Sequence, residues 1–199
     1  MPTKMINDDK KALRRELKEV RASLPEEYVR GARQSILDLL FSHPAFIKAK
    51  TVLTYYPVGS ELDVLEIARH SLALGKQVAF PLCHPEGPYM TFHLVGSLRE
   101  LSENIGSYGI PEPCADSPAV FDFSDSVCIV PALAFSKDGY RIGYGKGYYD
   151  RFLESFDGLS LGLVYHRLLL DSLPTDKYDK KVQLIITEKE VLPTDEALE

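Results

Sequence analysis

The segment from Lys137 to Phe152, KDGYRIGYGKGYYDRF, combines glycines with basic and acidic side chains at a spacing that suits phosphate binding. Gly143, Gly145 and Gly147 alternate along it, and Lys146 stands between the last two. Apolar residues at helical spacing follow Gly147, so we expect a helix to begin there. Backbone N–H groups without side-chain crowding can converge on phosphate oxygens at such a helix start. The segment therefore predicts a phosphate-binding loop.

Charged side chains must contribute as well, because a helix dipole adds only about 0.3–1 kcal/mol to anion binding. Lys146 inside the loop and Arg141 just before it are placed to neutralise a phosphate. Asp150, in the first turn of the expected helix, is a natural magnesium ligand beside phosphates, although it could instead stabilise the helix dipole. The loop as a whole could also be a turn that only joins a strand to a helix, and the residues alone leave both interpretations open.

Two common nucleotide-binding motifs are excluded. A Walker A loop requires Ser or Thr after its Gly-Lys pair, whereas Gly147 follows Lys146. The dinucleotide motif G-x-G-x-x-G, started at Gly143, would need a glycine where the chain has Tyr148.

Apolar periodicity places the loop within an alternation of strands and helices. Helices are expected over Asp8–Ser23, from Pro25 to before His43, over Leu62–Leu74 and from Gly147. Strands are expected over Thr51–Tyr56, Lys76–Leu82 and Tyr89–Val95, from Ser126 toward Phe135, and over Leu159–Tyr165 and Val182–Glu188. Ser23 with Glu26 predicts a capping box. The pattern predicts an α/β fold, in which residues 1–199 form a single three-layer domain with a mainly parallel sheet and helices on both faces.

Composition limits the classes of function. The chain has 199 residues, no apolar run long enough to cross a bilayer and no convincing targeting segment at its start. Its three cysteines lack metal-ligand spacing, which favours a reducing, cytoplasmic environment. A net charge of −6 disfavours nucleic acid, yet six Lys or Arg residues between positions 10 and 21 suit a small anionic ligand. We expect small-molecule substrates, no membrane or nucleic-acid partner, and a monomer or weak dimer.

The segment PALAFSKDGYRIGYGKGYYDRF also matches a long family signature, with Ser136 where the family often has Asp and Ile142 in place of Leu. Weaker matches follow the family's order: Lys10 with Arg14, then TYYPVGSELD, GKQVAFP and the turn Gly109–Pro113. By these motifs, nearly the whole chain resembles the 5-formyltetrahydrofolate cyclo-ligase family, also called methenyltetrahydrofolate synthetases.

The resemblance implies an ATP-dependent carbon–nitrogen ligase of folate and one-carbon metabolism. Such an enzyme uses magnesium and ATP to convert 5-formyltetrahydrofolate into 5,10-methenyltetrahydrofolate, ADP and phosphate. The implied catalytic residues are Lys146 and Arg141. The implied ATP-binding residues are Lys10, Lys11, Arg14, Arg141, Gly143, Gly145, Lys146, Gly147, Tyr148 and Tyr149. Folate would contact Tyr56, Glu61, Tyr144 and Tyr148, and magnesium would bind Asp150 and Asp179, with Asp176 as the competing ligand.

Several of these residues have plainer interpretations. Lys10 and Arg14 share a helix face that could be a solvated basic stripe, and Glu61 could simply occupy the first turn of a helix. Tyr56 and Tyr149 could be core aromatics. Glu112, between two prolines, could border the folate pocket, but a position at the surface is the default expectation. Family members often carry Gln and Asp where this chain has Leu168 and Gln183, and we expect both positions near the site.

Two other functions compete with the cyclo-ligase. The same loop could serve a kinase of another small acceptor, or a non-catalytic nucleotide- or RNA-binding relative. The intact loop with Lys146 and Asp150, together with the negative net charge, favours the enzyme.

Overall fold

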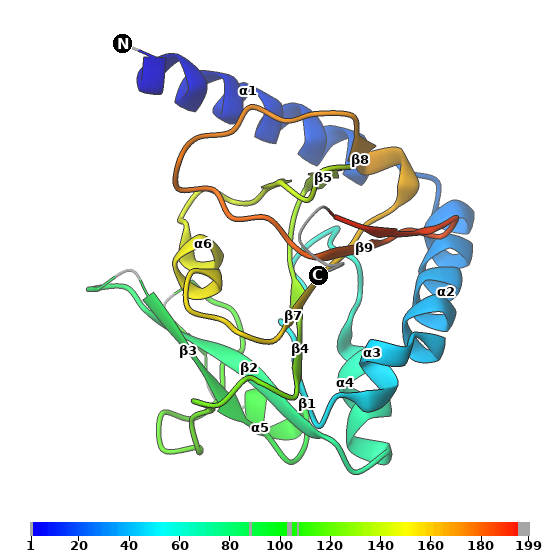
Figure 1. Cartoon of the computed structure of the whole chain (residues 1–199), viewed down its shortest axis with the longest axis vertical. Helices are drawn as coiled ribbons and strands as arrows, with labels where there is room; N and C mark the ends of the chain where they lie inside the picture. The colour runs from blue at the N-terminus through cyan, green and yellow to red at the C-terminus, as the bar shows by residue number, and fades with distance from the viewer. Residues whose placement is uncertain (1, 88, 103–104, 107, 195–199) are drawn as a thin grey trace.

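Figure 1 shows the computed structural model of the chain, which describes residues 2–87, 89–102, 105–106 and 108–194. The helices are α1 (Pro2–Ala22), α2 (Glu26–Ser42), α3 (Pro44–Lys48), α4 (Leu65–Ala73), α5 (Arg99–Ser102), α6 (Tyr148–Leu153) and the 3-10 helix η1 (His166–Leu168). The strands are β1 (Thr51–Leu53), β2 (Gln77–His84), β3 (Tyr89–Leu94), β4 (Ser126–Val130), β5 (Ala134–Ser136), β6 (Arg141–Ile142), β7 (Leu159–Leu163), β8 (Leu169–Leu170), β9 (Leu184–Ile186) and β10 (Val191–Pro193).

The main sheet has seven strands in the order β10-β9-β7-β4-β1-β2-β3. The neighbours from β9 to β2 pair in parallel, and β10 and β3 join the two edges in antiparallel fashion. Every residue of the central strand β4 is buried, as expected for a strand covered on both faces. Helices α2, α3 and α4 lie on one side of this sheet and α6 on the other (Figure 1). The predicted α/β architecture with a mainly parallel sheet is confirmed.

A small second sheet, in the order β6-β5-β8, carries the glycine-rich loop. The sequence predicted a strand that starts at Ser126 and runs toward Phe135, but Pro131 separates β4 from β5. Proline cannot donate to a strand ladder, so the chain leaves the main sheet at the carboxyl end of β4. β5 then pairs with β6, with Phe135 opposite Arg141. This turn delivers the glycine loop to the carboxyl ends of the parallel strands.

Several predicted boundaries need correction. β1 ends at Leu53, three residues before the predicted end at Tyr56, although the Thr54 N–H still donates to the Ala79 carbonyl oxygen of β2. The predicted capping box is wrong, because α2 has Pro25 at its N-cap position without a side-chain cap, and the Ser23 hydroxyl donates to the Val20 carbonyl oxygen at 2.8 Å. Helix α3 was not predicted. Strand β10 was also missed, so the predicted strand Val182–Glu188 is not the last one.

Helix α1 packs on the fold through a face that is mostly basic. Lys10, Leu17 and Arg21 are only 4%, 5% and 7% exposed, and their helical spacing places them on one face. The Lys10 ammonium donates to Asp176 at 2.9 Å and also to Asp179. In Figure 1, α1 accordingly runs beside the orange segment that precedes β9. Helix α1 is thus joined to a segment far along the chain by buried polar contacts.

Candidate functional site

A cavity of about 390 Å³ lies at the carboxyl ends of β1 and β4. Its wall comes from α1, the segment after β1, strands β2 and β3, residues 108 and 110–112, the loop 141–147 and α6. The volume falls within the range of small-molecule sites. Ligands of open α/β sheets bind in this position, outside the carboxyl ends of the strands.

The glycine-rich loop forms one side of the cavity, and two of its glycines are required by its backbone. Gly145 has φ +92° and Gly147, at the N-cap of α6, has φ +70°, where side chains are disfavoured. A Cβ on Gly145 would also lie 3.1 Å from Arg14 Cζ. Gly143 has neither constraint, but its carbonyl oxygen accepts a 2.9 Å hydrogen bond from Arg14 Nε. The loop is therefore fitted closely around the Arg14 guanidinium.

The cations of this wall differ in how far they are neutralised. Arg141 donates to Asp150 Oδ1 and to the Lys180 carbonyl oxygen, both at 2.8 Å, and its side chain is 5% exposed. Lys146 is exposed, with its Nζ 5.8 Å from the centroid of the Tyr108 ring. Within the described ranges, neither Lys146 nor Arg14 makes an ion pair. Two positive charges thus remain available to an anion.

The two predicted metal ligands, Asp150 and Asp179, both line the cavity. Each makes its hydrogen bonds through a single oxygen: Asp150 Oδ1 accepts from Arg141 and from the Lys180 backbone, and Asp179 Oδ2 accepts from Lys10 and from the Asp176 backbone. No three His, Cys, Asp or Glu residues gather as a metal site among the residues described. Magnesium commonly binds one or two carboxylates and completes its shell with phosphates and water, and this donor set fits that mode.

Asp176, the competing metal ligand, does not line the cavity. Its Oδ2 accepts from Lys10 and its Oδ1 from the Tyr178 backbone at 2.9 Å. These two hydrogen bonds lower the pKa of Asp176. The geometry favours Asp179 over Asp176 as the partner of Asp150.

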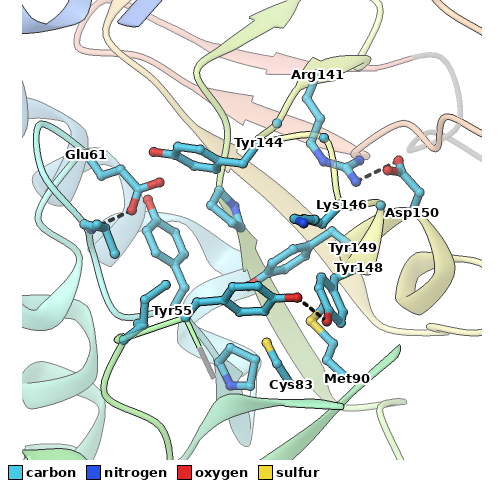
Figure 2. Close-up of a pocket in the computed structure, with 18 of the residues that line it drawn as sticks. Tyr55, Glu61, Cys83, Met90, Arg141, Tyr144, Lys146, Tyr148, Tyr149 and Asp150 are labelled. Carbon is cyan, nitrogen blue, oxygen red and sulfur yellow. Dashed lines mark hydrogen bonds and ion pairs between the residues drawn. The ribbon is translucent and has the colours of Figure 1, made fainter. Parts of the chain in front are cut away.

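The opposite side of the cavity is acidic and aromatic. Figure 2 shows Glu61 across the pocket from Arg141 and Asp150, with Tyr144 between them. Glu61 Oε2 accepts from the Val58 backbone N–H at 2.7 Å. Burial, followed by the nearby Glu61 carboxylate, raises the pKa of Tyr144 to about 12, whereas Arg21 opposes the shift. One end of the cavity thus offers positive charge and the other a carboxylate acceptor.

The floor of the cavity carries Cys83 and Met90, and Glu112 also lines it (Figure 2). The prediction that Glu112 lies at the surface is wrong, because the residue is only 6% exposed. Burial raises the pKa of Glu112, although hydrogen bonds from Cys83 oppose the change. A Cβ on Gly106 would lie 2.1 Å from Glu112 Cδ, so this glycine makes room for the carboxyl group. Only the match of the turn Gly109–Pro113 to the family signalled this residue in the sequence.

The two tyrosines of α6 play different structural parts. The Tyr148 hydroxyl lies 2.9 Å from the Tyr108 hydroxyl, and this hydrogen bond, with burial, raises the pKa of Tyr148 to about 12. Tyr149 lines the cavity and also packs on Phe92, at 6.4 Å between ring centroids. Its hydroxyl is buried and has no partner among the residues described. Tyr149 therefore packs against the hydrophobic core and also lines the cavity, in agreement with both predictions.

The structure brings most of the predicted site residues together. The predicted residues that line the cavity are Lys10, Arg14, Tyr56, Glu61, Arg141, Gly143, Tyr144, Gly145, Lys146, Gly147, Tyr148, Tyr149, Asp150 and Asp179. Lys11 is exposed and outside the lining, because it is one position away from the inward face of α1. The expectation that Leu168 and Gln183 lie near the site is wrong. Leu168 belongs to the core, and the Gln183 side chain accepts from the Ser160 N–H, near the start of β7.

The fold and this pocket define an α/β protein with a ligand site that is cationic at one end and acidic at the other. The sequence profile of the 5-formyltetrahydrofolate cyclo-ligase family matches residues 6–188. The chain therefore belongs to this family of ligases. None of the helices in the ranges that the structure describes is long and apolar enough to cross a membrane.

Individual relatives agree with the family profile. A 5-formyltetrahydrofolate cyclo-ligase of Mycolicibacterium smegmatis is 30% identical over 184 residues, which cover 90% of this chain and 94% of that protein. The 5-formyltetrahydrofolate cyclo-ligase of Haemophilus influenzae is 27% identical over 182 residues, which cover 88% of this chain and 95% of that protein. The NMR structure of Aquifex aeolicus 5,10-methenyltetrahydrofolate synthetase has a TM-score of 0.80 and 34% identity, covering 94% of this chain and 93% of that one.

Proposed function

We propose that this chain, as a single domain, converts 5-formyltetrahydrofolate and ATP into 5,10-methenyltetrahydrofolate, ADP and phosphate. The observation that carries the proposal is the polarity of one cavity. Lys146 and Arg14 offer uncompensated positive charge at one end, and Glu61 offers an acceptor at the other. The first end suits the phosphates of a nucleotide, and the second suits a pterin, whose amino and ring N–H groups are donors.

The chemistry needs the formyl oxygen to become a leaving group. The terminal phosphoryl group of ATP is transferred to that oxygen, and ADP departs. The ten-position nitrogen attacks the formyl carbon and loses its proton, and the carbon–oxygen bond breaks to release phosphate. No covalent bond to the enzyme forms, so the chain contributes positioning and charge neutralisation. In this proposal Lys146 and Arg141 neutralise the transferred phosphoryl group.

The remaining residues divide between the two ends of the cavity. Nucleotide phosphates would contact Lys10, Arg14, Arg141, Gly143, Gly145, Lys146, Gly147 and Tyr148. The folate would contact Tyr56, Glu61, Tyr144 and the other face of Tyr148. Tyr149 would close the wall between the two substrates. Lys11, which is exposed and does not line the cavity, is left out.

Asp150 and Asp179 would hold the magnesium ion. When bound, the ion would supply positive charge at the phosphate oxygens. The ion pair of Asp150 with Arg141 keeps the carboxylate beside the loop, with Oδ2 outside that bond. The ion pair with Lys10 of α1 likewise keeps the Asp179 carboxylate at the cavity wall.

The test is to mix the purified protein with magnesium, ATP and 5-formyltetrahydrofolate. The near-ultraviolet absorbance of the methenyl product and the ADP formed are measured together. We expect equal amounts of both, and no ADP when the folate is omitted. ADP formation with another acceptor but not with 5-formyltetrahydrofolate would indicate a kinase. Nucleotide binding without turnover would indicate a non-catalytic relative.

A further inference from the structure

Arg21 is a buried arginine of α1 that joins three separate segments. It is 7% exposed and donates hydrogen bonds to Ser60 Oγ at 3.1 Å, the Ala132 carbonyl oxygen at 3.2 Å and the Tyr144 hydroxyl at 2.8 Å. Ser60 lies between β1 and α4, Ala132 follows β4, and Tyr144 belongs to the glycine loop. One guanidinium therefore fixes the relative positions of three parts of the cavity wall without lining the cavity itself.

The charge of Arg21 has no direct counterion in the described part of the chain. A buried charge costs free energy unless it is compensated. The cost is reduced by its three hydrogen bonds, to the Ser60 hydroxyl, the Ala132 carbonyl oxygen and the Tyr144 hydroxyl. Arg21, Ser60 and Tyr144 thus form one hydrogen-bonded unit.

Arg21 also restrains the backbone next to Glu61. Its Nε bond to Ser60 holds the residue just before Glu61 in the chain. Glu61 in turn closes its own turn by accepting from the Val58 N–H. The carboxylate is therefore held by the same turn that Arg21 restrains.

We propose that Arg21 is a positioning residue that holds Tyr144 and the turn of Glu61 in place at the folate end of the cavity. The identity of the ligand in this inference rests on the proposed function. A residue that only anchored α1 would affect both substrates alike, since α1 also carries Lys10 and Arg14 at the nucleotide end. The contacts of Arg21 with Ser60 and Tyr144 instead predict a defect confined to the folate.

The kinetic test compares Arg21→Met and Tyr144→Phe with Arg15→Met, which removes an exposed arginine of the same helix. We expect Arg21→Met to raise the KM for 5-formyltetrahydrofolate at least tenfold and to change the KM for ATP less than twofold. Arg15→Met should change neither. Tyr144→Phe should reproduce much of the effect, and the double variant should be less than additive because the two residues share one hydrogen bond. Equal increases for both substrates, or no increase, would overturn the inference.

A second measurement does not depend on turnover. The backbone amides of Val58 and Glu61 are hydrogen-bonded within the turn that Arg21 restrains. Hydrogen exchange should therefore be faster in peptides containing them in Arg21→Met than in Arg15→Met, with β4 and β7 unchanged. If the exchange rate of these peptides were the same in Arg21→Met and Arg15→Met, the restraint of the Glu61 turn by Arg21 would be refuted, even in an active enzyme. An inactive wild type would refute the proposed function instead, and exchange would still decide the role of Arg21.

Arg21→Lys covers the case in which Arg21→Met does not fold. Lysine keeps the charge but lacks the planar fork that reaches three acceptors. We expect it to restore folate KM in part and to leave exchange around Ser60 faster than in wild type. If Arg21→Lys had the wild-type KM for the folate and the wild-type exchange rate around Ser60, charge alone would suffice. That result would contradict the positioning role.

Discussion

Lys146 and Arg14 stand apart from the other cations of the cavity. Lys10 is paired with two aspartates and Arg141 with Asp150, so carboxylates already take up part of their charge. Lys146 is also exposed, which leaves its ammonium free to move onto a phosphate. Its free charge, more than the helix dipole of the six-residue α6, is the expected source of phosphate binding.

Lys146→Met should therefore abolish most of the turnover without unfolding the chain. Loss of a group that stabilises transition-state charge typically lowers kcat by about 10²–10³-fold. The matched control is Lys48→Met, an exposed lysine of α3 outside this cavity. Methenyl formation and the thermal midpoint are measured for both variants. Turnover of Lys146→Met within a few fold of the control would argue against the assignment.

The cavity cysteine should be unreactive. Burial, together with the charge of Glu112, raises the pKa of Cys83 to about 12, so its thiol stays protonated at neutral pH. Cys128 is fully buried and Cys114 is exposed. Iodoacetamide at pH 8, followed by mass spectrometry of the folded protein, should label Cys114 alone. Labelling of Cys83 at the rate of Cys114 would contradict the described environment.

At the scale of elements, α1 is joined to the fold by ion pairs whose pH dependence can be stated. Burial lowers the pKa of Lys10, but hydrogen bonds and charges of Asp179 and Asp176 outweigh it, and the net pKa lies above 10.5. Lys10 lowers the pKa of Asp176 below 3.8. The Asp176 contribution to stability is therefore present above pH 3.8 and is lost as pH falls through the lower folded-state pKa. The Lys10 contribution is complete below pH 10.5 and is lost as pH rises through its raised pKa.

Asp176→Asn should destabilise the protein at pH 7 by about 1.5–3 kcal/mol, the usual range for a hydrogen bond to a charged group. The loss should shrink as pH falls below 3.8, because the unfolded-state carboxylate then takes up a proton, and should vanish below the lowered pKa of the folded state. Asp171→Asn is the control, because it breaks an exposed pair with Lys137 that should contribute little. Urea unfolding between pH 3 and pH 7 measures both. A destabilisation that does not vary with pH would contradict the ion-pair account.

The glycine loop shows what local sequence predicts and what it does not. Alternating glycines next to an apolar helical pattern correctly placed the loop and the start of α6. They did not reveal that Gly145 is shaped around Arg14, nor that Gly143 lacks a backbone requirement for glycine. The contacts of this loop with Arg14 depend on α1, which lies more than a hundred residues earlier in the chain.

For the whole molecule, the sheet could be predicted because buried parallel strands are short apolar runs, as in Thr51–Leu53 and Ser126–Val130. The interruption at Pro131 was missed, since the apolar run continues through it. Sites formed between distant segments could not be derived from pattern. Lys10 and Asp176 are 166 positions apart, and neither the burial of Glu112 nor the contacts of Arg21 leave a local signal.

The parallel order of the sheet brings the two ends of the proposed substrate site into one cavity. The carboxyl ends of β1 and β4 lie next to each other, so the Glu61 segment and the glycine loop face the same space. The central claim is that ATP and the formyl group meet in this space and that phosphate leaves with the formyl oxygen.

The most direct test uses 5-formyltetrahydrofolate labelled with oxygen-18 in its formyl group. The protein is incubated with magnesium, unlabelled ATP and the labelled folate, and the released phosphate is analysed by mass spectrometry. The account predicts one labelled oxygen in each phosphate released. Unlabelled phosphate formed alongside the methenyl product would contradict it.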